Sequence, residues 1–136
     1  MPKLKHIAIA TPDPDKTAQF YEDVMGMKVV ARNDFGDTYG VFLSDGYLNL
    51  ALLRFKTDEA ALCEQGAKFV GLHHIGFLMK DEAENEAVLQ KLQDLKAPFL
   101  QGGPLGAPGV YAEVKAKDPN GVTLDISVGG WPGVGR

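Results

Sequence analysis

Two similar stretches, "LKHIAIATPDPD" near the start and "LHHIGFLMKDEA" in the second half, constrain the fold of this chain most strongly. Each places one histidine, His6 or His74, in an apolar segment, with bulky apolar residues one and three positions later. Because successive side chains of a strand alternate between faces, the bulky residues would cover one face and the histidine would point to the other. The repetition predicts a duplicated unit with one histidine in each copy. Two equivalent imidazoles in turn suggest a metal site.

The length of 136 residues fits one domain, which can bury a core large enough to fold without disulfides. Cys63 is the only cysteine, so no internal disulfide can form. The chain carries 14 Lys and Arg against 18 Asp and Glu, without a basic cluster, which argues against nucleic acid or an anionic membrane as a partner. The start lacks the apolar core of a secretory signal, and no run is long enough to span a bilayer. We therefore expect a soluble, cytoplasmic protein.

Apolar alternation and turn signals predict the same order of elements in both halves, a strand, a helix and three strands. In the first half the strands are expected at about 3–10, 29–32, 39–43 and 47–53. The helix in "TPDPDKTAQFYEDVMGM" would be capped by Asp13 or Asp15 and would share one apolar face among Phe20, Tyr21, Val24 and Met25.

The sequence of the second half predicts strands at about 72–79, around Phe99, at 110–116 and at 122–128, with a helix at about 81–95. The apolar stripe of that helix would consist of Val88, Leu92 and Leu95. The glycine- and proline-rich segment 97–109 is either a plain connection or a flap over a cavity. We expect a single domain, 1–136, with module one at about 1–56, a linker at about 57–70, module two at about 71–128 and a flexible tail at 129–136.

Four polar side chains on predicted strands are candidate metal ligands: His6, His74, Asp125 and Asn49. In the last strand Asp125 lies on the polar face that matches the histidines, and Asn49 holds the corresponding place in the first half. If both sheets curve around a shared cavity, these residues can converge on one point. Two imidazoles and one carboxylate suit Fe(II), Mn(II), Ni(II), Co(II) or Zn(II). Asn49 would be a weak fourth ligand, because its amide oxygen is neutral.

Structural roles compete with these assignments, because a single histidine in a strand is more often hydrogen-bonded than metal-bound. Equivalent placement of His6 and His74 in the two halves favours the metal site. His73, one position before His74, would point to the opposite face of the strand and is expected to be structural. Glu113 could be a substitute carboxylate on the neighbouring strand. Tyr111 and Lys115, two positions before and after Glu113, would lie on the same face of the strand and could line the pocket. Exposure of that face to solvent would explain these polar residues as well.

The segments "KHIAIATPDPDKTAQFYEDVMGMKVV", "LHHIGFLMKD" and "KDPNGVTLDIS", in this order, resemble the vicinal oxygen chelate superfamily. This superfamily includes glyoxalase I, methylmalonyl-CoA epimerase, extradiol dioxygenases and bleomycin-resistance proteins. The resemblance implies an α+β fold of two βαβββ modules, a cupped mixed sheet around a metal-binding cavity, helices outside, and ligands at His6, His74 and Asp125. The family carboxylate is usually glutamate. The fourth family position aligns with Asn49 only if one residue is dropped.

The resemblance implies an enzyme whose divalent metal ion binds two adjacent oxygens of a small-molecule substrate. Two histidines, one carboxylate and a weak fourth ligand favour an Fe(II) dioxygenase, an oxidoreductase. The alternative is a glyoxalase I-like lyase or an epimerase, with Asp125 or Glu113 as the base and Tyr111 as a further candidate catalytic residue. A metal-free binding protein of the bleomycin-resistance type is the third possibility. Members of this size are usually dimers, so a homodimer is expected.

Overall fold

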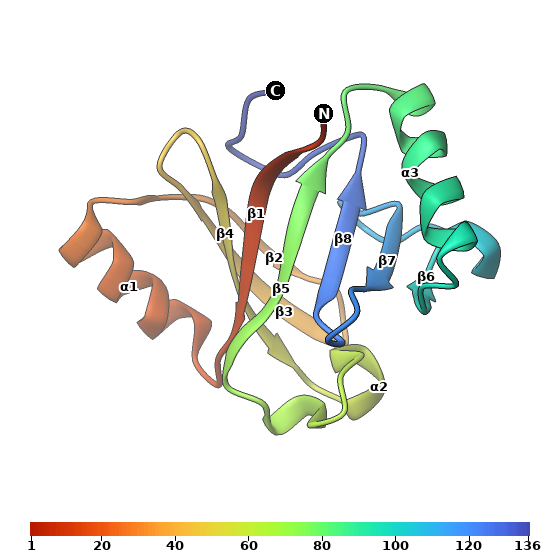
Figure 1. The fold of residues 1–136 in the computed structure, drawn as a ribbon. Coiled ribbons are helices and arrows are strands. Elements are labelled where there is room, and N and C mark those ends of the chain that lie inside the picture. Colours follow the sequence, from red (N-terminus) through yellow and green to blue (C-terminus); the bar gives the residue numbers. More distant parts are fainter. The chain divides into compact units, whose positions relative to one another are not determined.

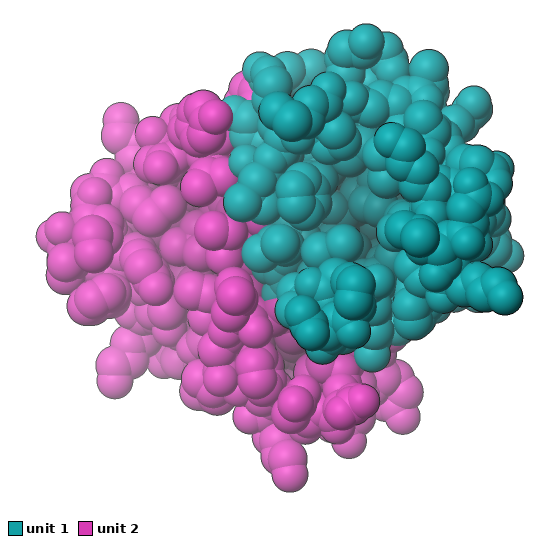
Figure 2. Space-filling view, in the orientation of Figure 1, with its two compact units in different colours: residues 1–5, 74–131, 136 teal, residues 6–73, 132–135 magenta.

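The computed structural model describes residues 1–136 (Figure 1). The chain divides into two compact units, which have different colours in Figure 2. One unit consists of residues 1–5, 74–131 and 136, and the other of residues 6–73 and 132–135. The first five residues therefore belong with the second half of the sequence, and residues 132–135 belong with the first half.

The unit that contains most of the first half follows the predicted order of elements. Its elements are β1 (Lys3–Ala10), α1 (Pro14–Met25), β2 (Lys28–Asp34), β3 (Thr38–Ser44), β4 (Asn49–Phe55), α2 (Asp58–Ala61) and the 3-10 turn η1 (Gly66–Lys68). The strand order is β2-β3-β4-β1, with β1 and β4 parallel and the other pairs antiparallel. In the parallel pair His6 is the register partner of Asn49, which brings two of the candidate ligands onto neighbouring strands.

Helix α1 begins where the sequence predicts, because the Asp13 carboxylate accepts a hydrogen bond from the Lys16 backbone N–H at 3.1 Å. Its buried face differs from the prediction. Ala18 is fully buried against a cluster formed by Val41, Leu43, Leu50 and Leu52. The predicted face was right only for Tyr21, which packs on this cluster.

Three residues of the predicted apolar face of α1 are largely exposed: Phe20 (54%), Val24 (58%) and Met25 (65%). That part of the prediction was wrong. Pro14, Ala18 and Tyr21 recur at four- and three-residue spacing and form a narrower stripe. The prediction favoured large apolar side chains, whereas the small side chain of Ala18 is the one that is fully buried against the strands.

The unit that contains most of the second half repeats this arrangement. Its elements are β5 (Gly71–Leu78), α3 (Glu82–Asp94), β6 (Phe99–Gln101), the 3-10 turn η2 (Gly103–Leu105), β7 (Val114–Lys117) and β8 (Thr123–Ser127). Its strand order is β5-β8-β7-β6, again with the first strand parallel to the last. Each unit thus carries four strands in a mixed sheet, together with its helices, and the predicted α+β class is confirmed.

Two predictions for the second half need correction. Leu95 is 82% exposed beyond the end of α3, whereas Leu89 packs on the core of Met79, Val114 and Ile126 together with Val88 and Leu92. The strand expected from Val110 begins only at Val114. Tyr111 has a left-handed backbone (φ 64°), which is incompatible with a regular strand at that residue.

No helix is both long and apolar enough to cross a bilayer.

Candidate metal centre

His74 lies in β5 and is buried. Its Nε2 is 3.1 Å from Asp125 Oδ2. Burial lowers the pKa of His74, and this effect exceeds the opposing attraction of the Asp125 carboxylate. The imidazole is therefore neutral near pH 7, and a neutral imidazole is the form that binds metal ions.

Asp125 lies in β8 and is also buried, with a different partner on each carboxylate oxygen. Oδ2 faces His74, and Oδ1 is 2.5 Å from Nζ of Lys115. Lys115 and Asp125 are register partners in the antiparallel pair β7–β8, so the backbone places the two side chains together. The lysine ammonium compensates the buried carboxylate, which would otherwise be costly to bury.

His6 and Asn49 form a second buried pair, on β1 and β4. Nδ1 of His6 is 2.8 Å from Oδ1 of Asn49. The other end of the amide, Nδ2, donates to the carbonyl oxygen of Pro132 at 2.9 Å. Oδ1, the atom through which Asn49 would bind a metal ion, is therefore engaged by His6. The role of Asn49 as a fourth ligand stays a prediction.

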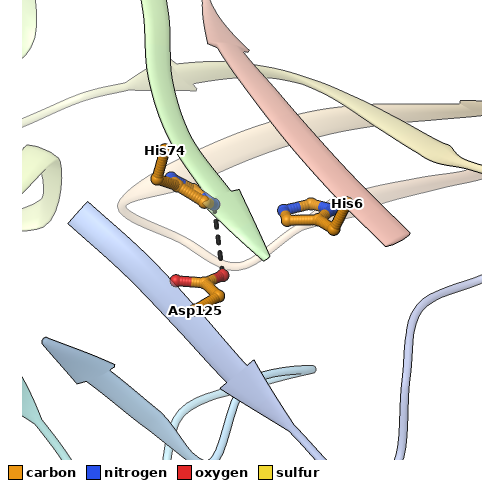
Figure 3. A group of neighbouring side chains, drawn as sticks. All are labelled: His6, His74 and Asp125. Carbon is orange, nitrogen blue, oxygen red and sulfur yellow. Dashed lines mark ion pairs between the residues drawn. The ribbon is translucent and has the colours of Figure 1, made fainter. Parts of the chain in front are cut away.

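His6, His74 and Asp125 offer three potential ligand atoms, one from each residue, within 4.8 Å of one another (Figure 3). All three residues are buried, and the atoms are two imidazole nitrogens and one carboxylate oxygen. This set fits a divalent transition-metal ion of the kind expected from the sequence.

Glu113 and Tyr111 precede β7 in the chain. Glu113 Oε2 accepts the N–H of Val128 at 2.9 Å, and Oε1 accepts the N–H of Gly129 at 3.3 Å. The carboxylate thus holds the backbone that leaves β8. Tyr111 is half-buried at the left-handed position described above. Catalytic roles for both residues stay predictions.

His73 has the structural role that its parity suggests. Its Nε2 donates to the carbonyl oxygen of Ala61 at 2.7 Å, and its ring lies 4.6 Å from the ring of Phe55, centroid to centroid. These contacts connect β5 to the segment that follows β4.

The sequence carries a signal for the Lys115–Asp125 pair. "KDPNG" predicts a tight turn between the last two strands. Pairing outward from that turn places Lys117 opposite Thr123 and Lys115 opposite Asp125, as the structure shows. The contact of Asn49 with Pro132 joins residues 83 positions apart and leaves no comparable pattern in the sequence.

The sequence profile of the Glyoxalase/Bleomycin resistance protein/Dioxygenase superfamily matches residues 3–126. The chain therefore belongs to this superfamily. It is 28% identical over 134 residues to the mitochondrial methylmalonyl-CoA epimerase of Mus musculus, and the match covers 91% of this chain and 71% of that protein.

Solved structures of methylmalonyl-CoA epimerases share the fold. A complex with methylmalonyl-CoA and NH4+ has a TM-score of 0.72 at 23% identity and covers 95% of this chain and 96% of the other. A variant of the Streptomyces coelicolor enzyme with 2-nitronate-propionyl-CoA has a TM-score of 0.71 at 23% identity, with 96% of both chains covered. The Mycobacterium tuberculosis enzyme has a TM-score of 0.68 at 19% identity and covers 95% of this chain and 88% of the other.

Proposed function

We propose that this chain is a metal-dependent isomerase that moves a proton at the carbon atom next to a thioester carbonyl. The observation that carries the proposal is Asp125, a buried carboxylate held between His74 Nε2 and Lys115 Nζ. The relationship to the mouse methylmalonyl-CoA epimerase supports a branched acyl-CoA as the substrate class. This is the epimerase alternative of the sequence analysis, and it is better supported than the dioxygenase.

The proposed reaction requires a base, a site for the negative charge and a proton donor. The base removes the proton from the carbon between the two carbonyl groups, and the electron pair of the broken C–H bond moves toward the thioester oxygen. A proton returned to the opposite face of that carbon gives the epimer, with no net oxidation or reduction. The atoms balance without any co-reactant.

Asp125 is the base that the geometry supports best, because it is the carboxylate in the candidate ligand group. The Lys115 ammonium, 2.5 Å from Oδ1, compensates the negative charge of this buried carboxylate. Glu113 is less well placed for this role, because both of its oxygens accept backbone hydrogen bonds. Tyr111 and Glu113 are the candidates for the donor on the opposite face.

His6, His74 and Asp125 would hold the metal ion. A bound divalent ion would supply Lewis-acid stabilisation of the charge that develops on the substrate oxygens. The chain's own contribution is a neutral, buried imidazole at His74 and a compensated carboxylate at Asp125.

Isotope exchange tests the proposal directly. Purified protein with Co(II) or Mn(II) is incubated with one epimer of methylmalonyl-CoA in D2O, and deuterium at the branched carbon is followed by mass spectrometry together with epimer composition. We expect exchange and epimerisation, both abolished by a chelator and by Asp125→Asn. Glu113→Gln serves as the matched carboxylate variant and distinguishes the two candidate bases. Absence of exchange in the metal-loaded protein would refute the proposal.

An Fe(II) dioxygenase is the second candidate, because two histidines and one carboxylate are also the ligand set of many oxygen-activating iron enzymes. Oxygen consumption with a catechol and Fe(II), with a yellow ring-cleaved product, would favour it over the isomerase. The third possibility, a metal-free binding protein, is tested by elemental analysis of protein purified without chelator, because such a protein would contain no stoichiometric transition metal.

A further inference from the structure

We infer that Asn49 is a positioning residue that fixes the tautomer of His6, and that the backbone carbonyl of Pro132 fixes the orientation of Asn49. The inference deepens the proposed function, and only its final step, metal binding by His6, rests on that function. The three residues form one hydrogen-bonded chain within the unit that contains residues 6–73 and 132–135.

The orientation of the Asn49 amide follows from the chemistry of Pro132. A backbone carbonyl oxygen can only accept hydrogen bonds, so the amide atom 2.9 Å away must be the NH2 group. The reverse orientation would place two acceptor oxygens against each other in a buried site. The carbonyl oxygen of the amide must then point away from Pro132, toward His6.

The tautomer of His6 follows in the same way. Asn49 Oδ1 is an acceptor only, so the proton of a neutral imidazole lies on Nδ1, which is 2.8 Å away. Nε2 then carries the lone pair. Parallel pairing of β1 with β4 places the two residues at the same register position, so the backbone supports this contact. A histidine that donates from one ring nitrogen to a fixed acceptor presents the other nitrogen to a metal ion.

The segment that supplies the Pro132 carbonyl is held in place by its neighbours. Ser44 Oγ is 2.9 Å from the carbonyl oxygen of Gly133, and Trp131 is buried. Gly133 has φ +75°, and a Cβ atom there would lie 2.9 Å from Val30 Cγ1 and 3.0 Å from Ser44 Cβ. A single alanine at Gly133 should therefore move the segment. At Gly135 a Cβ atom would meet nothing within 4 Å, which provides a matched control.

The first test measures the tautomer of His6 in metal-free protein labelled with 15N-histidine. Long-range 1H–15N spectra distinguish Nδ1–H from Nε2–H imidazole, and we expect Nδ1–H in the wild type. Asn49→Leu should shift His6 toward the Nε2–H form, and Gly133→Ala should do so in part. Gly135→Ala should leave the spectrum unchanged. Asn49→Asp, which keeps an acceptor for Nδ1–H, should retain the wild-type tautomer.

An Nε2–H tautomer in the wild type would overturn the inference. So would an unchanged tautomer in Asn49→Leu, provided that circular dichroism shows a folded protein. If Asn49→Leu does not fold, an unchanged tautomer of His6 in folded Gly133→Ala would overturn the inference instead.

The second test measures Co(II) affinity by titration and separates the inference from the proposed function. We expect Asn49→Leu to bind Co(II) about 10- to 100-fold more weakly than the wild type, the usual effect of losing a partner of a ligating histidine. Wild-type affinity in Asn49→Leu would refute the link to metal binding. If the wild type binds no Co(II) although His6 has the expected tautomer, the proposed function fails while the assignment of the hydrogen-bonded chain stands.

Discussion

Lys115 and Asp125 are paired both through the backbone register of their strands and through their side chains. They are register partners on neighbouring antiparallel strands, and Lys115 Nζ lies 2.5 Å from Asp125 Oδ1. The lysine side chain is 18% exposed and the aspartate side chain 4%, so the carboxylate is the more deeply buried partner. The lysine is thus the counter-ion that makes burial of the candidate ligand possible.

Replacing Lys115 by methionine should destabilise the protein. The substitution keeps much of the apolar stem but leaves a buried carboxylate without its cation, which typically costs about 3–5 kcal/mol. We expect a loss of about 3 kcal/mol in the free energy of unfolding, measured by urea denaturation at pH 7. Partial exposure of Lys115 places the effect at the lower end of that range.

Lys117→Met, on the same strand, is the matched control and should change stability by less than about 0.5 kcal/mol. In a double-mutant cycle, Lys115→Met combined with Asp125→Asn should cost less than the sum of the single variants. Additive costs would contradict direct coupling of the pair.

The two neighbouring histidines of β5 should respond differently to removal. His74→Ala should abolish stoichiometric metal binding and turnover while the fold survives, because it removes one of three proposed ligands. His73→Ala should keep metal binding and lose stability, because it removes the hydrogen bond to the Ala61 carbonyl. Elemental analysis and thermal unfolding of both variants check this, and unchanged metal content in His74→Ala would refute the ligand assignment.

Gly102 should tolerate alanine much less well than Gly106. Both have positive φ (66° and 106°), so both substitutions carry backbone strain. A Cβ atom at Gly102 would also collide with the carbonyl oxygen of Glu113, whereas at Gly106 it would meet nothing within 4 Å. We expect a clearly larger drop in melting temperature for Gly102→Ala. Equal drops would show that this backbone approach is not tight.

Acid should weaken the start of α3. The Asp81 carboxylate accepts the N–H of Glu84 at 2.9 Å, and the Glu84 carboxylate accepts the N–H of Lys80 at 2.6 Å. These backbone hydrogen bonds lower the pKa of both residues. A carboxyl whose pKa is lower in the folded state stabilises it above its unfolded pKa, about 4, and this stabilisation is lost as the pH falls further.

We therefore expect the stability of the wild type to fall between about pH 5 and pH 3 more steeply than that of Asp81→Asn/Glu84→Gln. Asparagine at position 81 still has a side-chain oxygen that can accept the N-cap hydrogen bond. The comparison therefore measures the effect of carboxylate titration and not the loss of the cap. Glu86→Gln, which removes an exposed carboxylate from the same helix, is the charge control and should retain the wild-type slope. Denaturant unfolding across this pH range provides the measurement.

Strand positions were predictable because alternation directly encodes which face a residue occupies. The expected first strand, 3–10, agrees with β1, and the strand expected at about 47–53 corresponds to β4, which contains Asn49. Helix starts were equally accessible, since Asp13 and Asp81 are the caps of α1 and α3. These features depend on residues that are close in sequence.

The errors arise where contacts between residues that are far apart in the sequence determine the structure. Ala18 is buried against residues of β3 and β4, which are distant in sequence, whereas the sequence favours the larger Phe20 and Val24 for that face. The amide orientation of Asn49 depends on the carbonyl of Pro132, a backbone atom that residue identity does not reveal. Pairing of Lys115 with Asp125 lies between these cases, since it needs only the register of one hairpin.

The allocation of the chain ends to the two units has a consequence for dissection of the protein. Residues 1–5 group with the second half, and residues 132–135 group with the first. A gene cut between the repeats would therefore yield two fragments that each lack part of their own compact unit and carry part of the other's. A faithful copy of either unit would require the terminal segments to be regrafted.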